Sequence, residues 1–404
     1  MEVIDDPYKM DATKIDLILY MLRPLTIIEN LFGRFRYRKV GGNIEILSRR
    51  MKFYAIFLAS LTVAAFGIIF VNEGLQQTVT GISKIVDIVD KVASVTIVIQ
   101  HILSTVIFLH YTKNNVHIIK LIAHIDDNLN ISKNRQFYKD SRRLIQIGIS
   151  IFIIIYILLT IYKLNTKIYE LPTEILLTIF DFERHLEVLA FCIFIKTMKD
   201  RLSIVNKVLE HVIVTKNRGH TLNIPAKNLR NQNVLYAGFT INDSSIIRTL
   251  GITYDLIGEA CDEINKVFKF HIFKALFTTF VYIIITIWSS IHYIRTSTAP
   301  HLLFLFISLG LLDIVSVGIM AYTCEVLLLK RNSTKILVNE LIMNYDLTRQ
   351  MRLQAKAFME LIEVWPLQIY AYDMFAIDIK LMLKFISVST TYLIVIIQHP
   401  LKYV

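Results

Sequence analysis

The sequence is poor in the residues that cross-link loops or interrupt helices. Its 404 residues include only 3 cysteines, 7 prolines and 13 glycines. Cys192, Cys261 and Cys324 fall in segments expected to be membrane or cytoplasmic, so we expect no disulfide framework. Metal-ligand spacings, glycine-rich phosphate loops and nucleophile motifs are also missing. We therefore expect neither an enzyme nor a cofactor nor a metal site.

The sequence is rich in apolar residues. The chain is 54% hydrophobic and 19% charged, and its mean hydropathy of +0.52 is typical of a polytopic membrane protein. The first 50 residues are polar and charged, unlike a signal peptide, so we expect insertion through an internal helix. We attribute the net charge of +11 to basic loops and attraction to anionic lipid, and expect no nucleic acid partner.

Seven apolar runs are long enough to cross a bilayer, which takes about 20 helical residues. They lie near 53–72, 92–111, 145–163, 173–195, 272–293, 302–325 and 379–398. Basic residues concentrate on one side if the N-terminus is cytoplasmic, because the short outer segments then hold only one or two each. We expect an all-α membrane protein with seven transmembrane helices, a cytoplasmic N-terminus and an extracellular C-terminus.

Helical spacing of apolar residues extends beyond the membrane. It predicts that spans four, five and six continue as amphipathic helices over 197–214, 245–270 and 334–362, with a mobile loop at 216–233. Another amphipathic helix is expected over 12–33, interrupted near Pro24. The expected parts are a cytoplasmic N-terminal segment (1–52), spans one to four (53–195), cytoplasmic helices (196–271), spans five and six (272–325), anchor helices (326–378), and span seven with a short tail (379–404).

The last span carries a polar stripe. At 100° per residue, five positions lie within about 40° of Lys380: Lys384, Ser387, Thr391, Ile394 and Gln398. Lipid would leave such polar groups unsatisfied, so this edge needs protein or water beside it. Several copies around an axis enclose water, whereas one helix does not. Alternatively, Ser387 and Thr391 bond to neighbouring helices. We expect Lys380 and Lys384 to snorkel toward the cytoplasm in preference to facing the ion path.

The C-terminal segment also resembles a known family. Thr391-Tyr392, five hydrophobic residues and Gln398 resemble the insect gustatory receptor signature of Thr-Tyr, five hydrophobic residues and Gln-Phe. Three further segments are similar to that family: 375–378 (Phe-Ala-Ile-Asp), the turn at 366–368, and 254–268 leading into the fifth span. His399 departs from the pattern, because the family has Phe at that position.

The resemblance implies a taste receptor that is a ligand-gated, nonselective cation channel in the plasma membrane of gustatory neuron dendrites. Four identical or similar subunits would each give their seventh helix to a central pore for monovalent and divalent cations, with cytoplasmic helices as the anchor. We expect the pore and gate to involve Ser387, Thr391, Ile394, Ile397 and Gln398. A small tastant would bind in an outward-facing pocket. Leu393 after Thr391-Tyr392 favours a bitter plant compound over a sugar.

Charged residues inside the fourth span point to a hydrated pocket or to mutual pairing. Inserting a charged residue at mid-membrane costs about 2.5–3.5 kcal/mol of free energy. We therefore expect that these residues pair with one another, as Asp181–Arg184 or Arg184–Glu187, that they line a hydrated pocket, or both. Trp288 and His292 share a face of the fifth span, where Trp288 belongs to a pocket or to the aromatic belt. Asp313 needs a partner on another helix. The candidate ligand-binding residues are Asp181, Arg184, His185, Trp288, His292, Tyr156, Thr160 and Phe304.

Two alternative functions are a G-protein-coupled receptor and a secondary transporter. A G-protein-coupled receptor would need the reverse orientation, and neither its Asp/Glu-Arg-Tyr motif nor its Asn-Pro-x-x-Tyr motif occurs where expected. A secondary transporter would show paired Gly- or Pro-broken spans in matching halves, and no such pair is seen.

Overall fold

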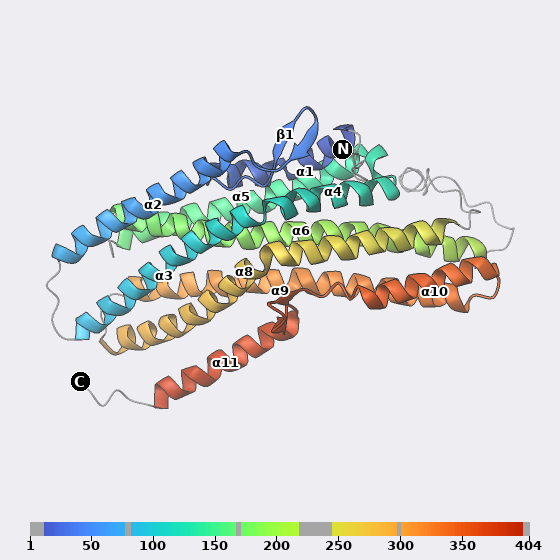
Figure 1. Ribbon diagram of the computed structural model, residues 1–404. Coiled ribbons are helices and arrows are strands. Elements are labelled where there is room, and N and C mark those ends of the chain that lie inside the picture. Colours follow the sequence, from blue (N-terminus) through green and yellow to red (C-terminus); the bar gives the residue numbers. More distant parts are fainter. Residues whose placement is uncertain (1–11, 77–81, 167–170, 218–244, 297–299, 399–404) are drawn as a thin grey trace.

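The computed structural model is an elongated bundle of helices with two short hairpins, and it describes residues 12–76, 82–166, 171–217, 245–296 and 300–398 (Figure 1). This confirms the expected all-α class for the described part of the chain. The predicted loop at 216–233 lies almost wholly outside that part, as does His399. The helices are α1 (Ala12–Leu31), α2 (Arg49–Gln76), α3 (Ile82–His110), α4 (Thr112–Asn128), η1 (Ile131–Lys133), α5 (Arg135–Thr166), α6 (Leu171–Asn217), α8 (Ser245–Thr296), α9 (Pro300–Met343), α10 (Arg349–Val364) and α11 (Ile379–Gln398). The strands are β1 (Arg38–Val40), β2 (Asn43–Glu45), β3 (Tyr370–Ala371) and β4 (Phe375–Ala376).

The long helices α6, α8 and α9 run side by side along the bundle and hold it together (Figure 1). At one end they pack with α1, α4 and α10, and this end contains the main hydrophobic core. Leu202, Ile257 and Leu327 are fully buried there, one from each long helix. α6 and α8 are each continuous over 47 and 52 residues, as the sequence predicts, because neither contains a proline past its first turn.

At the other end the helices splay apart and expose apolar side chains. On α2, Phe53, Phe57 and Leu61 are more than half exposed, and α5 shows the same pattern. A smaller cluster of Phe66, Val98, Leu177 and Phe180 joins α2, α3 and α6 here. Water would penalise such a surface at roughly 25 cal/mol per Å², so lipid is its natural neighbour.

Among the described residues, four helices are long and apolar enough to cross a membrane: Arg49–Val71, Arg135–Asn165, Ser245–Ile287 and Ile307–Met343. The pair Ser94–His110 and Thr112–Asn128, bent by 58°, makes a fifth if it counts as one span. Two of the seven predicted spans are not in this set. These are 173–195 in α6, which carries several charged residues within its apolar stretch, and 379–398 in α11. Several side chains of α11 lie outside the described residues.

Two expectations about helix boundaries were wrong. α1 runs through Pro24 without interruption, although proline removes one helical hydrogen bond. Its apolar face compensates, because Ile18, Met21 and Leu25 are at most 1% exposed. The expected helix over 334–362 is two helices, since α9 ends at Met343 and α10 begins after the capping Thr348, whose hydroxyl accepts from the Met351 amide at 3.3 Å.

A short linker joins α10 to α11 and docks on α8. The indole of Trp365 donates to Asp255 Oδ1 at 2.6 Å, and the Tyr254 hydroxyl donates to the Trp365 carbonyl at 2.8 Å. The hairpin β3–β4 follows, with Ala371 paired to Phe375. Gly258 makes this docking possible, because a Cβ at that position would lie 2.4 Å from Trp365 Cγ. Gly258 is therefore required for close approach of the linker.

We expect Gly258→Ala to destabilise the protein by about 1–3 kcal/mol, as overpacking does. Gly251→Ala is the matched control on the same helix, because its Cβ would lie at an ordinary 3.6 Å from Phe358 Cγ. Alanine there gains helix propensity, up to about 1 kcal/mol. Thermal unfolding of the two purified variants measures the difference. Equal melting temperatures would show that Trp365 does not pack on Gly258.

Candidate functional site

The charged residues of α6 point to two sides of the helix. Asp181, Arg184 and His185 are spaced by three and four residues and share one face, whereas Glu183 and Glu187 share another. Each face meets different helices. The first faces α5, α8 and α9, and the second faces α3, α8 and the segment after α1.

On the first face, Arg184 is held between two carboxylates. Its Nη1 lies 2.7 Å from Asp313 Oδ1 and its Nη2 lies 3.3 Å from Asp181 Oδ1. His185 Nε2 is 2.9 Å from the same Asp313 oxygen, and Lys163 Nζ is 3.7 Å from Asp181 Oδ2. Asp313 thus has the partners on another helix that the sequence predicts, and the Asp181–Arg184 pair is confirmed.

These groups border a cavity of about 50 Å³, which we call the Asp181 cavity. The Tyr156 hydroxyl hydrogen-bonds His185 Nδ1 at 2.5 Å and donates to the Asp181 carbonyl at 3.0 Å. Thr160 donates to its own helix, at the Tyr156 carbonyl. A cavity of this size has room for water but not for a drug-sized molecule. Its lining is Tyr156, Leu159, Thr160, Lys163, Thr178, Asp181, Arg184, His185, Tyr282, Leu309, Leu312 and Asp313.

The structure brings five of the eight candidate ligand-binding residues into this cavity: Tyr156, Thr160, Asp181, Arg184 and His185. Phe304 is not among its lining residues, because it is 59% exposed and packs against Tyr162 at 5.3 Å between ring centroids. The side chains of Trp288 and His292 lie outside the described residues. Tyr282 and Lys163 are cavity residues that the sequence analysis did not name.

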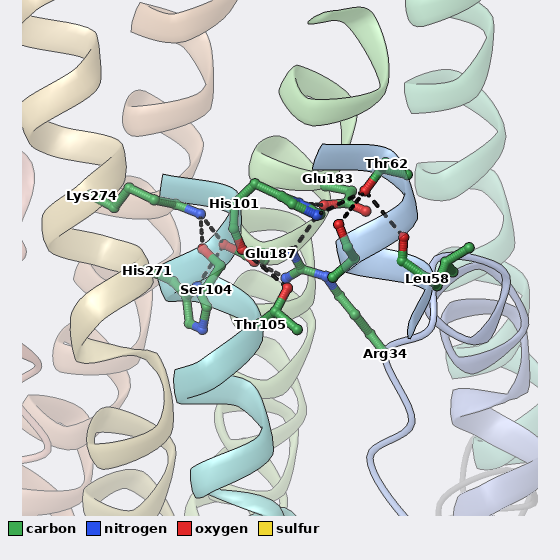
Figure 2. Close-up of polar contacts among 11 residues, drawn as sticks. Arg34, Leu58, Thr62, His101, Ser104, Thr105, Glu183, Glu187, His271 and Lys274 are labelled. Carbon is green, nitrogen blue, oxygen red and sulfur yellow. Dashed lines mark hydrogen bonds and ion pairs between the residues drawn. The ribbon is translucent and has the colours of Figure 1, made fainter. Parts of the chain in front are cut away.

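The second face of α6 carries a buried ion network, drawn in Figure 2. Glu187 pairs with Arg34 and accepts from Lys274 Nζ and His271 Nδ1, both at 2.6 Å. Glu183 lies 3.1 Å from Arg34 Nη2 and 2.6 Å from His101 Nδ1. Of the two alternative pairings expected for Arg184, the one with Asp181 is present, whereas Glu187 pairs with Arg34, His271 and Lys274.

Both groups of charges are balanced when the histidines are neutral. The two glutamates of the ion network face Arg34 and Lys274, and Asp181 and Asp313 face Arg184 and Lys163. Balanced, hydrogen-bonded charges are the form in which buried ions are tolerated. Lys274 could have been identified from the sequence as a member of this network, because a lysine inside a predicted span requires a partner.

The pore candidate α11 departs from the bundle at an angle (Figure 1). One side packs on α8 and α9, where Leu381 is buried and Phe385 meets Phe280 at 6.1 Å. No other described part of the chain covers the opposite, polar stripe, and Lys380, Lys384, Ser387 and Thr391 are all exposed. Ile394 is 48% exposed, and the side chains of Ile397 and Gln398 lie outside the described residues. Asp378 caps the helix, accepting from the Leu381 amide at 3.0 Å.

The part of the chain that the structure describes contains no group of three or more His, Cys, Asp or Glu side chains arranged to hold a metal ion. The three cysteines are all free and buried.

Comparisons with known proteins match most of the chain. A model of the 7tm chemosensory receptor family matches residues 22–402. The fold is similar to the insect olfactory receptor OR5 from Machilis hrabei, with a TM-score of 0.66 at 11% identity, covering 96% of this chain and 100% of that one. The same receptor in complex with eugenol gives a TM-score of 0.61 at 12% identity, with equal coverage. No curated protein matches the chain in sequence.

Proposed function

The chain belongs to the 7tm chemosensory receptor family, and we propose that it is a gustatory receptor that works as a ligand-gated, nonselective cation channel. The observation that carries this proposal is the uncovered polar stripe of α11. The Thr391 hydroxyl donates to the Ser387 carbonyl of its own helix at 3.0 Å, but the stripe as a whole, with its lysines and Ser387, needs water or protein beside it. Four copies arranged about one axis satisfy that need and form an ion path.

In this proposal Ser387 and Thr391 line the path, while Ile394, Ile397 and Gln398 form the narrow outer part. Apolar side chains brought together close a pore by excluding water, and rotation of polar groups toward the axis rewets it. Permeant ions are monovalent and divalent cations. The subunits are identical copies or close relatives, surrounded by lipid.

The proposed topology places the N-terminus in the cytoplasm and the C-terminus outside, in the plasma membrane of a taste neuron dendrite. The packed end, with α1, α4 and α10, is then the cytoplasmic anchor, and the splayed end crosses the membrane. The uneven distribution of basic residues supports this orientation. The linker docked on Gly258 connects the anchor to α11, so a movement of α8 is transmitted to the pore helix.

We place the tastant at the Asp181 cavity, extended toward Trp288, His292 and Phe304 on the outer parts of α8 and α9. Because the cavity holds only about 50 Å³, ligand entry requires neighbouring helices to separate, and that separation is the proposed gating movement. Donors and acceptors beside tyrosine rings suit a bitter plant compound or a sugar. OR5 has been solved with eugenol, which supports a small aromatic or polar ligand for this fold.

Tyr156→Phe is expected to shift the half-maximal tastant concentration by about fivefold to thirtyfold, because it removes the hydroxyl that holds His185 at the wall of the proposed ligand site, and a lost buried hydrogen bond costs roughly 1–2 kcal/mol. Single-channel conductance is expected to stay unchanged, since Tyr156 lines the Asp181 cavity, whose lining includes no residue of α11. Dose–response and single-channel recordings separate the two quantities. A changed conductance with unchanged potency would remove Tyr156 from the ligand site.

Heterologous expression with ion-substitution recordings tests the function itself. A channel gives tastant-evoked current in excised patches without internal nucleotide. Current that needs internal nucleotide would instead indicate a metabotropic receptor, and substrate flux without conductance would indicate a transporter. A panel of alkaloids, glycosides and simple sugars identifies the ligand class.

A further inference from the structure

A second cavity opens on the outside of the bundle, between α5, α6 and α9. We call it the Lys196 groove. It has a volume of about 320 Å³ and lies two to three turns along α6 from the Asp181 cavity. Its lining is Leu144, Ile145, Gly148, Leu189, Cys192, Ile193, Lys196, Lys199, Ile319, Tyr322, Thr323 and Val326.

The groove has an apolar floor and an apolar rim. Ile145 and Cys192 are buried beneath it, whereas Leu144, Ile319 and Tyr322 are more than half exposed at its edge. Gly148 borders open space in the groove, because a Cβ at that position would meet nothing within 4 Å. An apolar groove of about 320 Å³ has room for part of a hydrocarbon chain.

Two lysines line the groove beside these apolar walls. Lys199 Nζ lies 2.6 Å from Asp200 Oδ1, and Lys196 Nζ lies 2.9 Å from Asp200 Oδ2. Burial of Asp200 favours its neutral form, but the hydrogen bonds from Lys199 and Lys196 outweigh this and lower the pKa of the carboxyl. Two ammonium groups share one carboxylate, so one positive charge is left over.

The groove sits where the apolar surface of the bundle begins. On α5 the exposed apolar residues start at Leu144 and continue through Ile147, Ile151 and Ile154. The turns of α5 before them are basic, with Arg135, Lys139, Arg142 and Arg143. The predicted spans 145–163, 173–195 and 302–325 also begin or end at this level. The groove therefore lies at the boundary between lipid chains and headgroups.

We propose that the Lys196 groove binds one anionic phospholipid per subunit, with the phosphate at Lys196 and Lys199 and an acyl chain between α5 and α9. The surplus charge matches a phospholipid headgroup whose net charge is −1. Basic pockets between membrane helices on the cytoplasmic side are typical anionic-headgroup sites, and long lysine side chains reach headgroups readily. A zwitterionic headgroup gains less, because its cation cancels the charge of its phosphate and leaves no net negative charge.

The test is a lipid titration of the purified full-length receptor in detergent, with bound lipid counted by native mass spectrometry. Phosphatidylserine and phosphatidylcholine of equal chain length are compared. We expect tighter binding of phosphatidylserine, and about fivefold weaker binding of it for Lys196→Gln or Lys199→Gln, the effect of one lysine at a membrane surface. Lys207→Gln is the matched control, since it removes an exposed lysine from α6 eleven positions further along, outside the groove.

A second variant tests the apolar part while leaving both lysines in place. Gly148→Leu fills the groove, and its better helix propensity supports α5, so we expect loss of bound phosphatidylserine from a folded receptor. Three results would overturn the proposal: equal binding of the two lipids, unchanged binding by the Lys196→Gln/Lys199→Gln double variant with a native-like melting temperature, or a map in which a neighbouring subunit fills the groove.

Discussion

Replacing Glu187 with Gln is expected to remove most of the folded receptor. Its carboxylate is 5% exposed and is the shared partner of Arg34, His271 and Lys274. A neutral amide keeps the shape but leaves the two cations with only Glu183 as counter-ion. Breaking a buried pair from one side costs about 3–5 kcal/mol, a large share of the roughly 5–15 kcal/mol that stabilises a folded protein. The melting temperature and the monodisperse fraction in size-exclusion chromatography measure the loss.

Glu363→Gln is the control for that experiment. It makes the same chemical change in the Lys335–Glu363 pair, whose atoms are 3.6 Å apart and whose side chains are 47% and 64% exposed. Surface pairs contribute at most about 1 kcal/mol, so this variant should behave like the unmodified receptor. If Glu187→Gln matched Glu363→Gln, the ion network would not be essential for folding.

Thr391→Cys is expected to make the channel sensitive to a positively charged thiol reagent. A fixed cation beside the ion path opposes cation entry by about 4 kcal/mol at 4 Å for an effective dielectric constant of 20. We therefore expect tastant-evoked current to fall by more than about tenfold after modification. Whole-cell recording before and after the reagent measures the effect. The background should be low, because the three natural cysteines are buried.

Ser389→Cys provides the comparison on the same helix. Ser389 lies on the opposite side of α11, where it borders a cavity shared with α8 and α9. Modification there should leave most of the current. A block at Ser389 together with insensitivity at Thr391 would mean that the helix presents its other face to the ions.

Local spacing predicted part of the site correctly. Asp181 and Arg184 pair because residues three apart on a helix are neighbours, and Asp313 required a partner because it lies within a span. The family resemblance, which rested on the residues around Thr391, is confirmed at the level of chemosensory receptors by the match over 22–402.

Ion pairs between residues from distant parts of the chain could not be predicted from the sequence. Arg34 meets Glu183 across 149 positions, and it follows α1 in a segment with no helical period. Arg184 and Glu187 have the spacing of a helical pair, yet Glu187 pairs with Arg34 and Lys274 instead. Pro24 shows the same limit, because the buried face of α1 overrides a local helix-breaking signal.

A cryo-electron microscopy map of the assembled receptor in a lipid nanodisc tests the central claim most directly. The proposal predicts four copies, with Ser387 and Thr391 of each α11 directed at the shared axis and the C-terminus on the opposite face of the membrane from α1. A map with these side chains against lipid, or with both chain ends on one face, would contradict it.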